Sequence, residues 1–132
     1  MTLSTRRKLR IIIGLLFVLA GSNHFIVPRP YFAMMPDCLP AKAALVQVSG
    51  LAEILGGLGV LLRATRKLAA WSLILFLVAV FPANLQVALH GWPGVRLPPW
   101  ALWLRLPFQV AFIWGVYRLY LLPVHRERNA QE

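Results

Sequence analysis

The stretch LAAWSLILFLVAVFPANLQVAL, residues 68–89, decides the fold class of this chain. It contains no charged residue, and it is longer than the about 20 apolar residues that a transmembrane helix requires. Open strands leave backbone groups unsatisfied in lipid, and the run lacks the alternation of a barrel strand. It therefore predicts a membrane-spanning helix, whose strongly polar members are only Ser72, Asn84 and Gln86.

Three further apolar segments occur in the 132-residue chain, at about residues 9–27, 43–62 and 101–122. The connections and the two ends are short, so nothing remains for a soluble domain. We therefore predict an all-α membrane protein, a single domain of residues 1–132 built as a four-transmembrane-helix bundle. Residues 11–20, preceded by basic residues, also fit a secretory signal peptide loosely, but the apolar run continues through Val27, which favours a retained helix.

The positive charge of the chain predicts its orientation. Fourteen basic and four acidic residues give a net charge of +10, yet 59% of residues are hydrophobic and only 14% are charged. This composition excludes a disordered basic tail and argues against a nucleic-acid-binding protein. The basic residues on the side of the termini are Arg6, Arg7, Lys8, Arg10, Arg63, Arg66, Lys67, Arg118, Arg126 and Arg128; the other side has Arg29, Lys42, Arg96 and Arg105. The positive-inside rule predicts that both termini lie in the cytoplasm. A weaker consequence of the charge is attraction of these basic residues to anionic lipid headgroups.

Six polar residues inside the predicted helices are candidates for a ligand-binding site: His24, Ser49, Glu53, Asn84, Arg105 and Gln109. Ser49 and Glu53 are four residues apart and share a helix face, as do Arg105 and Gln109. Polar faces are costly in lipid, so these should turn inward. From a rise of about 1.5 Å per residue, Glu53 lies near mid-membrane and the others mostly lie in the outer half.

Glu53 is the strongest functional candidate, because no architectural role needs an acid at mid-depth. Within the predicted helices, Arg105 is the only base far from the cytoplasmic end. We expect its long side chain to approach Glu53, directly or through Gln109, Asn84 or His24. Alternatives remain open. Arg105 could extend to the outer interface, His24 could be merely interfacial, and Asn84, like Gln47 and Gln86, could only hold helices together.

Prolines and small residues predict a bundle that is tight at one end and open at the other. Pro82 should kink the third helix and free the Val78 carbonyl, and Pro107 should free that of Trp103. Ala52, Gly56, Gly57 and Gly59 predict a small-residue face for close packing.

The outer connections are short and rich in proline. Residues 31–35 predict a short interfacial helix, and Trp92 and Trp100 predict an aromatic belt or a cap on the bundle mouth. Cys38 is the single cysteine, so it has no partner for an internal disulfide.

Short motifs occur in order along nearly the whole chain. They are His24-Phe25 with the following Pro28-Arg29-Pro30-Tyr31-Phe32, then Leu45-Val46-x-x-Ser49-Gly50-Leu51-x-Glu53, Phe81-Pro82-Ala83-Asn84, and Arg105-Leu106-Pro107-Phe108-Gln109. Together they resemble the DoxX-like family of small bacterial membrane proteins. The resemblance implies a four-helix protein of the bacterial inner membrane that is associated with redox systems; wider relatives include cargo receptors and assembly chaperones.

The chain has no facing haem-ligand histidines, no cysteine pair and no cofactor motif, so we expect no redox centre of its own. We predict an accessory protein without independent catalytic activity, without catalytic residues and without a metal site. It would bind a lipid-like molecule, a quinone, or a redox partner or second copy of the chain in the polar outer cavity. The alternatives are an assembly factor that receives a partner helix and, less favoured because four helices lack an inverted repeat, a small proton-coupled transporter.

Overall fold

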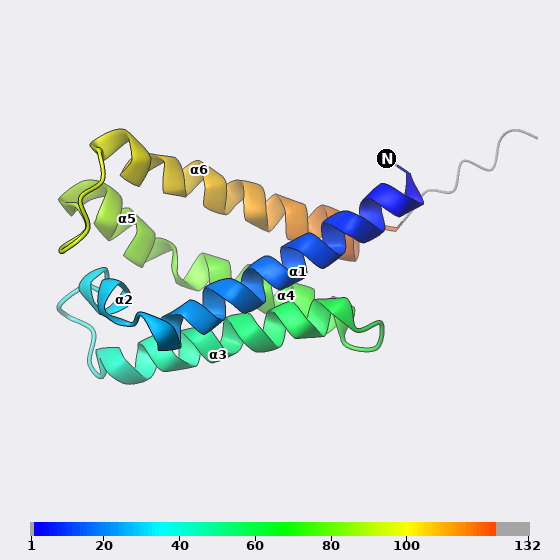
Figure 1. Cartoon of the computed structure of the whole chain (residues 1–132), viewed down its shortest axis with the longest axis horizontal. Coiled ribbons are helices and arrows are strands. Elements are labelled where there is room, and N and C mark those ends of the chain that lie inside the picture. Colours follow the sequence, from blue (N-terminus) through cyan, green and yellow to red (C-terminus); the bar gives the residue numbers. More distant parts are fainter. Residues whose placement is uncertain (1, 124–132) are drawn as a thin grey trace, which may run out of the picture.

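The structure is a computed structural model that describes residues 2–123, and every regular element in that range is a helix (Figure 1). The elements are α1 (Leu3–Ile26), α2 (Arg29–Ala33), α3 (Lys42–Leu61), α4 (Arg66–Ala79), α5 (Phe81–His90), α6 (Pro99–Val116) and the π-helical turn η1 (Tyr117–Leu121). Three stretches are long and apolar enough to cross a membrane: α1, α3 and the α4–α5 pair. The all-helical prediction is therefore confirmed.

The first helix begins earlier than residue 9, where the sequence placed its start. The Thr2 side chain accepts a hydrogen bond from the Thr5 amide and caps the helix, which then begins at Leu3. The basic residues at positions 6–10 are therefore helical and do not precede the helix as predicted.

The predicted third helix is two helices that meet at Val80. Val80 ends α4 and precedes α5, and Pro82 is the second residue of α5, where its missing N–H costs no helical hydrogen bond. The predicted kink at Pro82 is thus a full break. Pro107, in contrast, lies inside α6, which continues from Pro99 to Val116.

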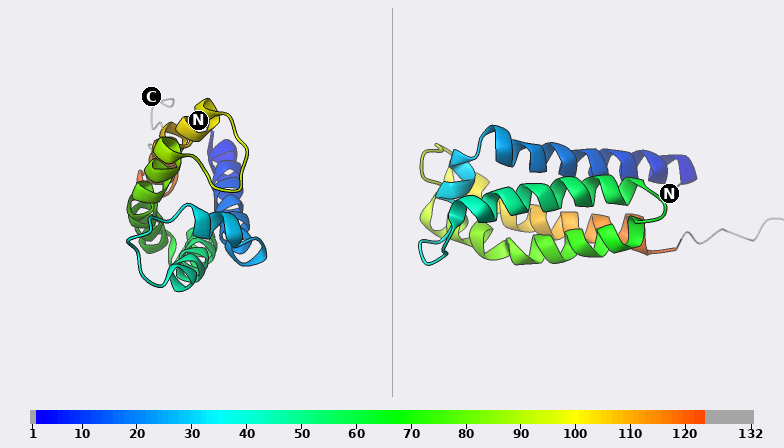
Figure 2. Two further views of the ribbon diagram at one scale, coloured as in Figure 1. Left: turned by 90° about the vertical axis from the view of Figure 1, so that its left-hand side faces the viewer. Right: turned by 90° about the horizontal axis from the view of Figure 1, so that it is seen from below.

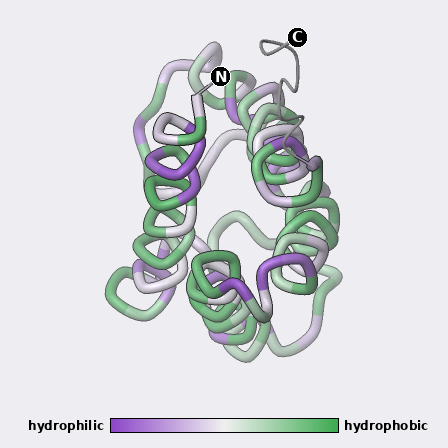
Figure 3. The backbone as a smooth tube through the Cα atoms, turned by 90° about the vertical axis from the view of Figure 1, so that its right-hand side faces the viewer, coloured by the Kyte–Doolittle hydropathy of each residue, from purple (hydrophilic) through white to green (hydrophobic). Residues whose placement is uncertain are grey.

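The long helices run side by side, and the short α2 lies across one end of them (Figure 2). Figure 1 shows α5 and α6 farther from α1 and α3 at this end than at the other. We call the α2 end the outer end and the opposite end, where α1 starts and α3 turns into α4, the basic end. Figure 3 views the molecule from the basic end and shows hydrophilic segments on α1 and on the α3–α4 turn. Arg126 and Arg128 lie outside the described residues.

The first and last helices are joined at the basic end by arginine side chains. Arg6 is buried; its Nε donates to the Leu119 carbonyl over 3.2 Å and its Nη2 donates to the Arg118 carbonyl over 3.0 Å and to the carbonyl of Leu122. Arg10 Nε donates to the same Leu119 carbonyl over 2.6 Å. Carbonyls at a helix C-terminus lack helical partners and carry partial negative charge, so both guanidiniums cap this end.

Two glycine pairs set the distance between α1 and α3. A Cβ on Gly21 would lie 2.6 Å from the Gly50 carbonyl oxygen, and one on Gly57 would lie 2.7 Å from that of Gly14. The two backbones are therefore in direct contact. The small residues of α3 do not form the single face predicted: a Cβ on Gly56 would meet Leu73 and one on Gly59 would meet Ala69, both on α4, and Ala52 is exposed.

Large apolar side chains cover the outside of the long helices. Leu19 is 66% exposed, Leu68 73% and Leu75 71%, while the core at the basic end contains Phe17 and Leu73. Soluble monomers rarely expose such extensive apolar surface, which suits contact with lipid.

Candidate functional site

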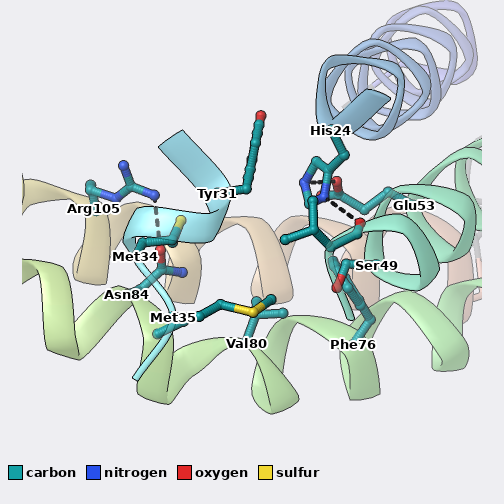
Figure 4. A pocket seen from close by; sticks show the side chains of 12 residues that line it. His24, Tyr31, Met34, Met35, Ser49, Glu53, Phe76, Val80, Asn84 and Arg105 are labelled. Atoms are coloured by element: carbon teal, nitrogen blue, oxygen red, sulfur yellow. Dashed lines mark hydrogen bonds and ion pairs between the residues drawn. The ribbon is translucent and has the colours of Figure 1, made fainter. Parts of the chain in front are cut away.

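A cavity of about 150 Å³ lies at the outer end, enclosed by α1, α2 and α3 on one side and by α4, α5 and α6 on the other (Figure 4). Five of the six predicted site residues line it: His24, Ser49, Glu53, Asn84 and Arg105. Gln109 does not line it but is hydrogen-bonded to Asn84. The side chains of all six predicted site residues therefore lie in or next to this cavity.

His24 and Glu53 form a buried pair across the α1–α3 contact, each only 9% exposed. His24 Nε2 lies 3.2 Å from Glu53 Oε2. On the other side of the ring, Nδ1 lies 3.1 Å from the Val46 carbonyl oxygen. A carbonyl only accepts, so this contact assigns a hydrogen to Nδ1.

With a hydrogen on Nδ1, one further proton can be bound by the pair at two places, His24 Nε2 or the Glu53 carboxylate. If the proton is on Nε2, the pair is imidazolium and carboxylate; if it is on Glu53, the pair is neutral imidazole and carboxylic acid. The net charge is zero in both arrangements, which reduces the free-energy cost of burying an acid. Glu53 Oε2 is buried and makes no hydrogen bond of regular geometry within the described residues; its polar neighbour is His24 Nε2 at 3.2 Å.

The helix α2 covers this pair. The Tyr31 ring stacks on the His24 ring, with 3.8 Å between centroids and 32° between planes. Tyr31 OH accepts a hydrogen bond of 2.9 Å from Asn23 Nδ2, and Trp92 Nε1 donates one of 2.7 Å to the Pro30 carbonyl. A short helix is present in this connection, but α2 at Arg29–Ala33 lies two residues earlier than the predicted residues 31–35. Trp92 caps the outer end, one of the two roles that the sequence allowed.

A second polar group lies on the opposite wall. Arg105 Nη2 donates to Asn84 Oδ1 over 3.0 Å, and Asn84 Nδ2 donates to Gln109 Oε1 over 3.0 Å. Gln109 Nε2 in turn donates to the Leu77 carbonyl, which in an unbroken helix would accept the amide of Phe81. The break at Val80 therefore exposes a carbonyl that α6 satisfies. It is the carbonyl of Leu77 that is used in this way, one residue before the Val78 carbonyl that the sequence indicated.

The expected approach of Arg105 to Glu53 is wrong. The guanidinium of Arg105 lies 4.3 Å from the Trp92 ring centroid and contacts Asn84, whereas Glu53 pairs with His24 (Figure 4). Arg105 is half-buried, and the Trp92 ring and Asn84 hold its guanidinium inside the outer end of the molecule. Its Nε is buried and has no hydrogen-bond partner among the described residues.

The remaining polar residues have simpler roles. Ser49 Oγ bonds the Leu45 carbonyl of its own helix over 2.6 Å while lining the cavity. Gln47 is exposed and has no hydrogen bond from its side chain within residues 2–123, so its predicted role between helices is not seen. Outside the helices, Asp37 accepts a 2.7 Å hydrogen bond from Lys42 Nζ, and this bond and the lysine charge hold the pKa of Asp37 below its usual value.

Sequence reasoning missed the residues that assemble the site. Tyr31 and the methionines Met34 and Met35 line the cavity, yet they were expected only at the interface. Gly21 was not singled out, although it precedes His24 by the same three residues that separate Gly50 from Glu53. That shared spacing is the signal that was available. Within the described residues no cluster of three or more His, Cys, Asp or Glu could hold a metal ion.

The fold and the site define a small helical protein with long apolar helices and a polar cavity built around a buried His–Glu pair. The chain belongs to the family described as Domain of unknown function (DUF8561), whose model matches residues 13–120. No curated protein and no solved structure matches the chain. The matched range contains all six predicted site residues.

Proposed function

We propose that this protein is an accessory protein of the bacterial inner membrane that binds the ring of a quinone-type, lipid-soluble molecule beside Glu53. In this proposal α1, α3, α4–α5 and α6–η1 each cross the membrane, and both termini are cytoplasmic. Three long apolar helices, the apolar outer surface and the concentration of arginines and lysines at the basic end support this placement.

The observation that carries the ligand proposal is the buried His24–Glu53 pair in the wall of the cavity, in which Glu53 Oε2 lies 3.2 Å from His24 Nε2 but makes no hydrogen bond of regular geometry within the described residues. A quinone carbonyl needs a hydrogen-bond donor, whereas a hydroquinone hydroxyl needs an acceptor. The pair with His24 supplies both. Glu53 accepts as a carboxylate when His24 holds the shared proton, and it donates when it holds that proton and its O–H turns from His24 Nε2 to the ligand. A fixed acceptor or a fixed donor would suit only one form of the ligand.

The shape of the cavity supports a ring as the ligand. A volume of about 150 Å³ matches an apolar cavity known to take a benzene-sized molecule. Its walls include Met34, Met35 and Phe76, which offer flexible and flat apolar contacts. The two ring oxygens of a para-quinone point in opposite directions, and the cavity has polar groups on opposite walls: Glu53 on one and Asn84 with Arg105 on the other (Figure 4).

The resemblance to the DoxX-like family is part of the proposal, because its members are associated with membrane redox systems. In this proposal the chain holds the ligand for a membrane redox partner. The protein itself would perform no electron transfer.

Native mass spectrometry of gently extracted protein, followed by titration with a short-chain ubiquinone or menaquinone analogue, tests the proposal. Glu53→Gln removes the exchangeable proton and should weaken binding by about tenfold, the loss of roughly one charged hydrogen bond. Asp37→Asn is the matched control, because it makes the same change at an exposed acid outside the cavity. Equal binding by both variants would contradict the site, and a stoichiometric protein partner in place of a small molecule would favour the assembly-factor alternative.

A further inference from the structure

A second cavity, of about 450 Å³, lies at the basic end, between the start of α1 and the α3–α4 turn. Four arginines line it: Arg7 and Arg10 from α1, and Arg63 and Arg66 from the turn and the start of α4. Ile11 contributes to its apolar lining. The segments that bring these arginines together are about fifty residues apart in the sequence.

Two of these arginines are held in place by backbone carbonyls. Arg66 Nε donates to the Val60 carbonyl over 3.1 Å and its Nη2 donates to the Leu61 carbonyl over 3.3 Å. Arg10 is held by its bond to the Leu119 carbonyl. Arg7 and Arg63 are exposed, and their side chains make no hydrogen bond within residues 2–123. The cavity thus combines two fixed guanidiniums with two adjustable ones.

The charge of this cavity is uncompensated in the described part of the chain. The two acids described there are Asp37, which lies at the outer end beside Lys42, and Glu53, which pairs with His24. Four guanidinium groups around one cavity repel each other, and a bound anion would relieve the repulsion. Arginine binds phosphate oxygens through two parallel hydrogen bonds, which makes phosphate the best-matched anion.

We propose that this arginine cavity binds the phosphate group of an anionic phospholipid of the cytoplasmic leaflet. The cavity lies where the apolar helices end, at the depth of lipid headgroups, and basic pockets between helices at this depth suit such lipids. Ile11, which is 43% exposed, and Leu61 line the cavity and provide apolar surface for an acyl chain. The inference rests on the proposed membrane insertion but is independent of the quinone site.

The test uses the full chain in neutral detergent at fixed ionic strength, because salt screens exposed charges. Thermal unfolding is followed while phosphatidylglycerol, phosphatidylcholine or inorganic phosphate is added. The double substitution Arg7→Gln and Arg63→Gln removes two cavity charges that support no internal hydrogen bond. Lys8→Gln with Lys67→Gln is the matched control, because it removes the same charge from the same end at exposed residues outside the cavity.

We expect phosphatidylglycerol to raise the unfolding temperature of the wild type and the lysine control. The arginine variant should need a roughly tenfold or higher lipid concentration for the same shift, the scale of two headgroup contacts. Equal responses of both double variants, or of the two lipids, would overturn the site, and an equal shift with inorganic phosphate would overturn the lipid as its source. Retention of the wild type in alkali-washed membranes separately tests membrane insertion. A protein that is not inserted can therefore be distinguished from an inserted protein whose arginine cavity does not bind the lipid.

Discussion

A Cβ atom on Gly50 would lie 2.8 Å from the carbonyl oxygen of Gly21, and a Cβ on Gly21 would lie 2.6 Å from the carbonyl oxygen of Gly50. This reciprocal contact makes α1 and α3 touch through their backbones. His24 and Glu53 each follow one of these glycines by three residues, about one helical turn. The distance across the buried pair is therefore determined by two residues that carry no functional group.

Gly50→Ala should destabilise the protein by about 1–3 kcal/mol, the usual cost of overpacking, and separate His24 from Glu53. The added methyl group would also lie 2.7 Å from His24 Cβ, so repacking requires a shift of α1. Reversible unfolding in detergent measures the effect. Gly115→Ala is the control, because its Cβ would meet only Ile13 Cδ1 at 3.7 Å and alanine favours a helix; similar losses at both positions would contradict the glycine contact.

Glu53→Gln should leave His24 as a neutral imidazole with its hydrogen on Nδ1. The glutamine amide can donate to Nε2, but it provides no negative charge to stabilise a buried imidazolium. Nitrogen-15 NMR of histidine-labelled protein distinguishes the two ring nitrogens and thus reports the tautomer. A hydrogen on Nε2 with none on Nδ1, in this variant or in the wild type, would refute the contact with Val46.

His24→Ala should cost more than Glu53→Gln, at about 3 kcal/mol, because it leaves a buried carboxyl group without its partner. The same substitution removes the stacking surface of Tyr31. Unfolding measurements on the single variants and on the double variant give the coupling between His24 and Glu53. Additive effects of the two substitutions would mean that the pair does not act as a unit.

Gln109→Leu should destabilise the contact between α6 and the α4–α5 break by about 1 kcal/mol. The substitution leaves the Leu77 carbonyl and one side of Asn84 without partners, and hydrogen bonds between membrane helices are worth about 0.6 kcal/mol on average. Gln47→Leu is the comparison, since the Gln47 side chain is exposed and unbonded within residues 2–123. We expect that change to be neutral or slightly stabilising.

Cys38 gives a direct test of orientation, because it is exposed, lies at the outer end and is the single cysteine of the chain. In intact spheroplasts a membrane-impermeant maleimide should label it. A Cys38→Ser, Ala64→Cys variant moves the thiol to the exposed turn at the basic end and should be labelled only after the membrane is permeabilised. The reverse pattern would invert the proposed topology.

The sequence predicted those features of the fold that a local pattern of residues determines by itself. Long apolar runs predicted the long helices, and Pro82 predicted the interruption between α4 and α5. The inward orientation of polar residues gathered His24, Glu53 and Asn84 at one cavity. The estimate of depth along each helix put Glu53 and Arg105 within reach of each other. It does not say which way each helix faces, so it did not identify the partners of the two residues.

Partners across helices depend on packing that no local pattern encodes. Gly21 and Gly50 allow α1 to pack directly against α3, and this packing places Glu53 beside His24. Arg105 instead contacts the ring of Trp92. Trp92 lies in a connection that the sequence indicated only as an aromatic belt or a cap. The start of α1 was misplaced because charged residues were assumed to lie outside the helix, although the four-residue spacing of Arg6 and Arg10 places both on one helix face.

The capping of η1 by Arg6 bears on the order in which the chain is made. Arg6 is synthesised 113 residues before Leu119, whose carbonyl it binds. The contact between α1 and α3 can form as soon as the first half of the chain has emerged. Closure between α1 and η1 must wait until η1 has been synthesised, so the contact made by this arginine forms after the contact between α1 and α3.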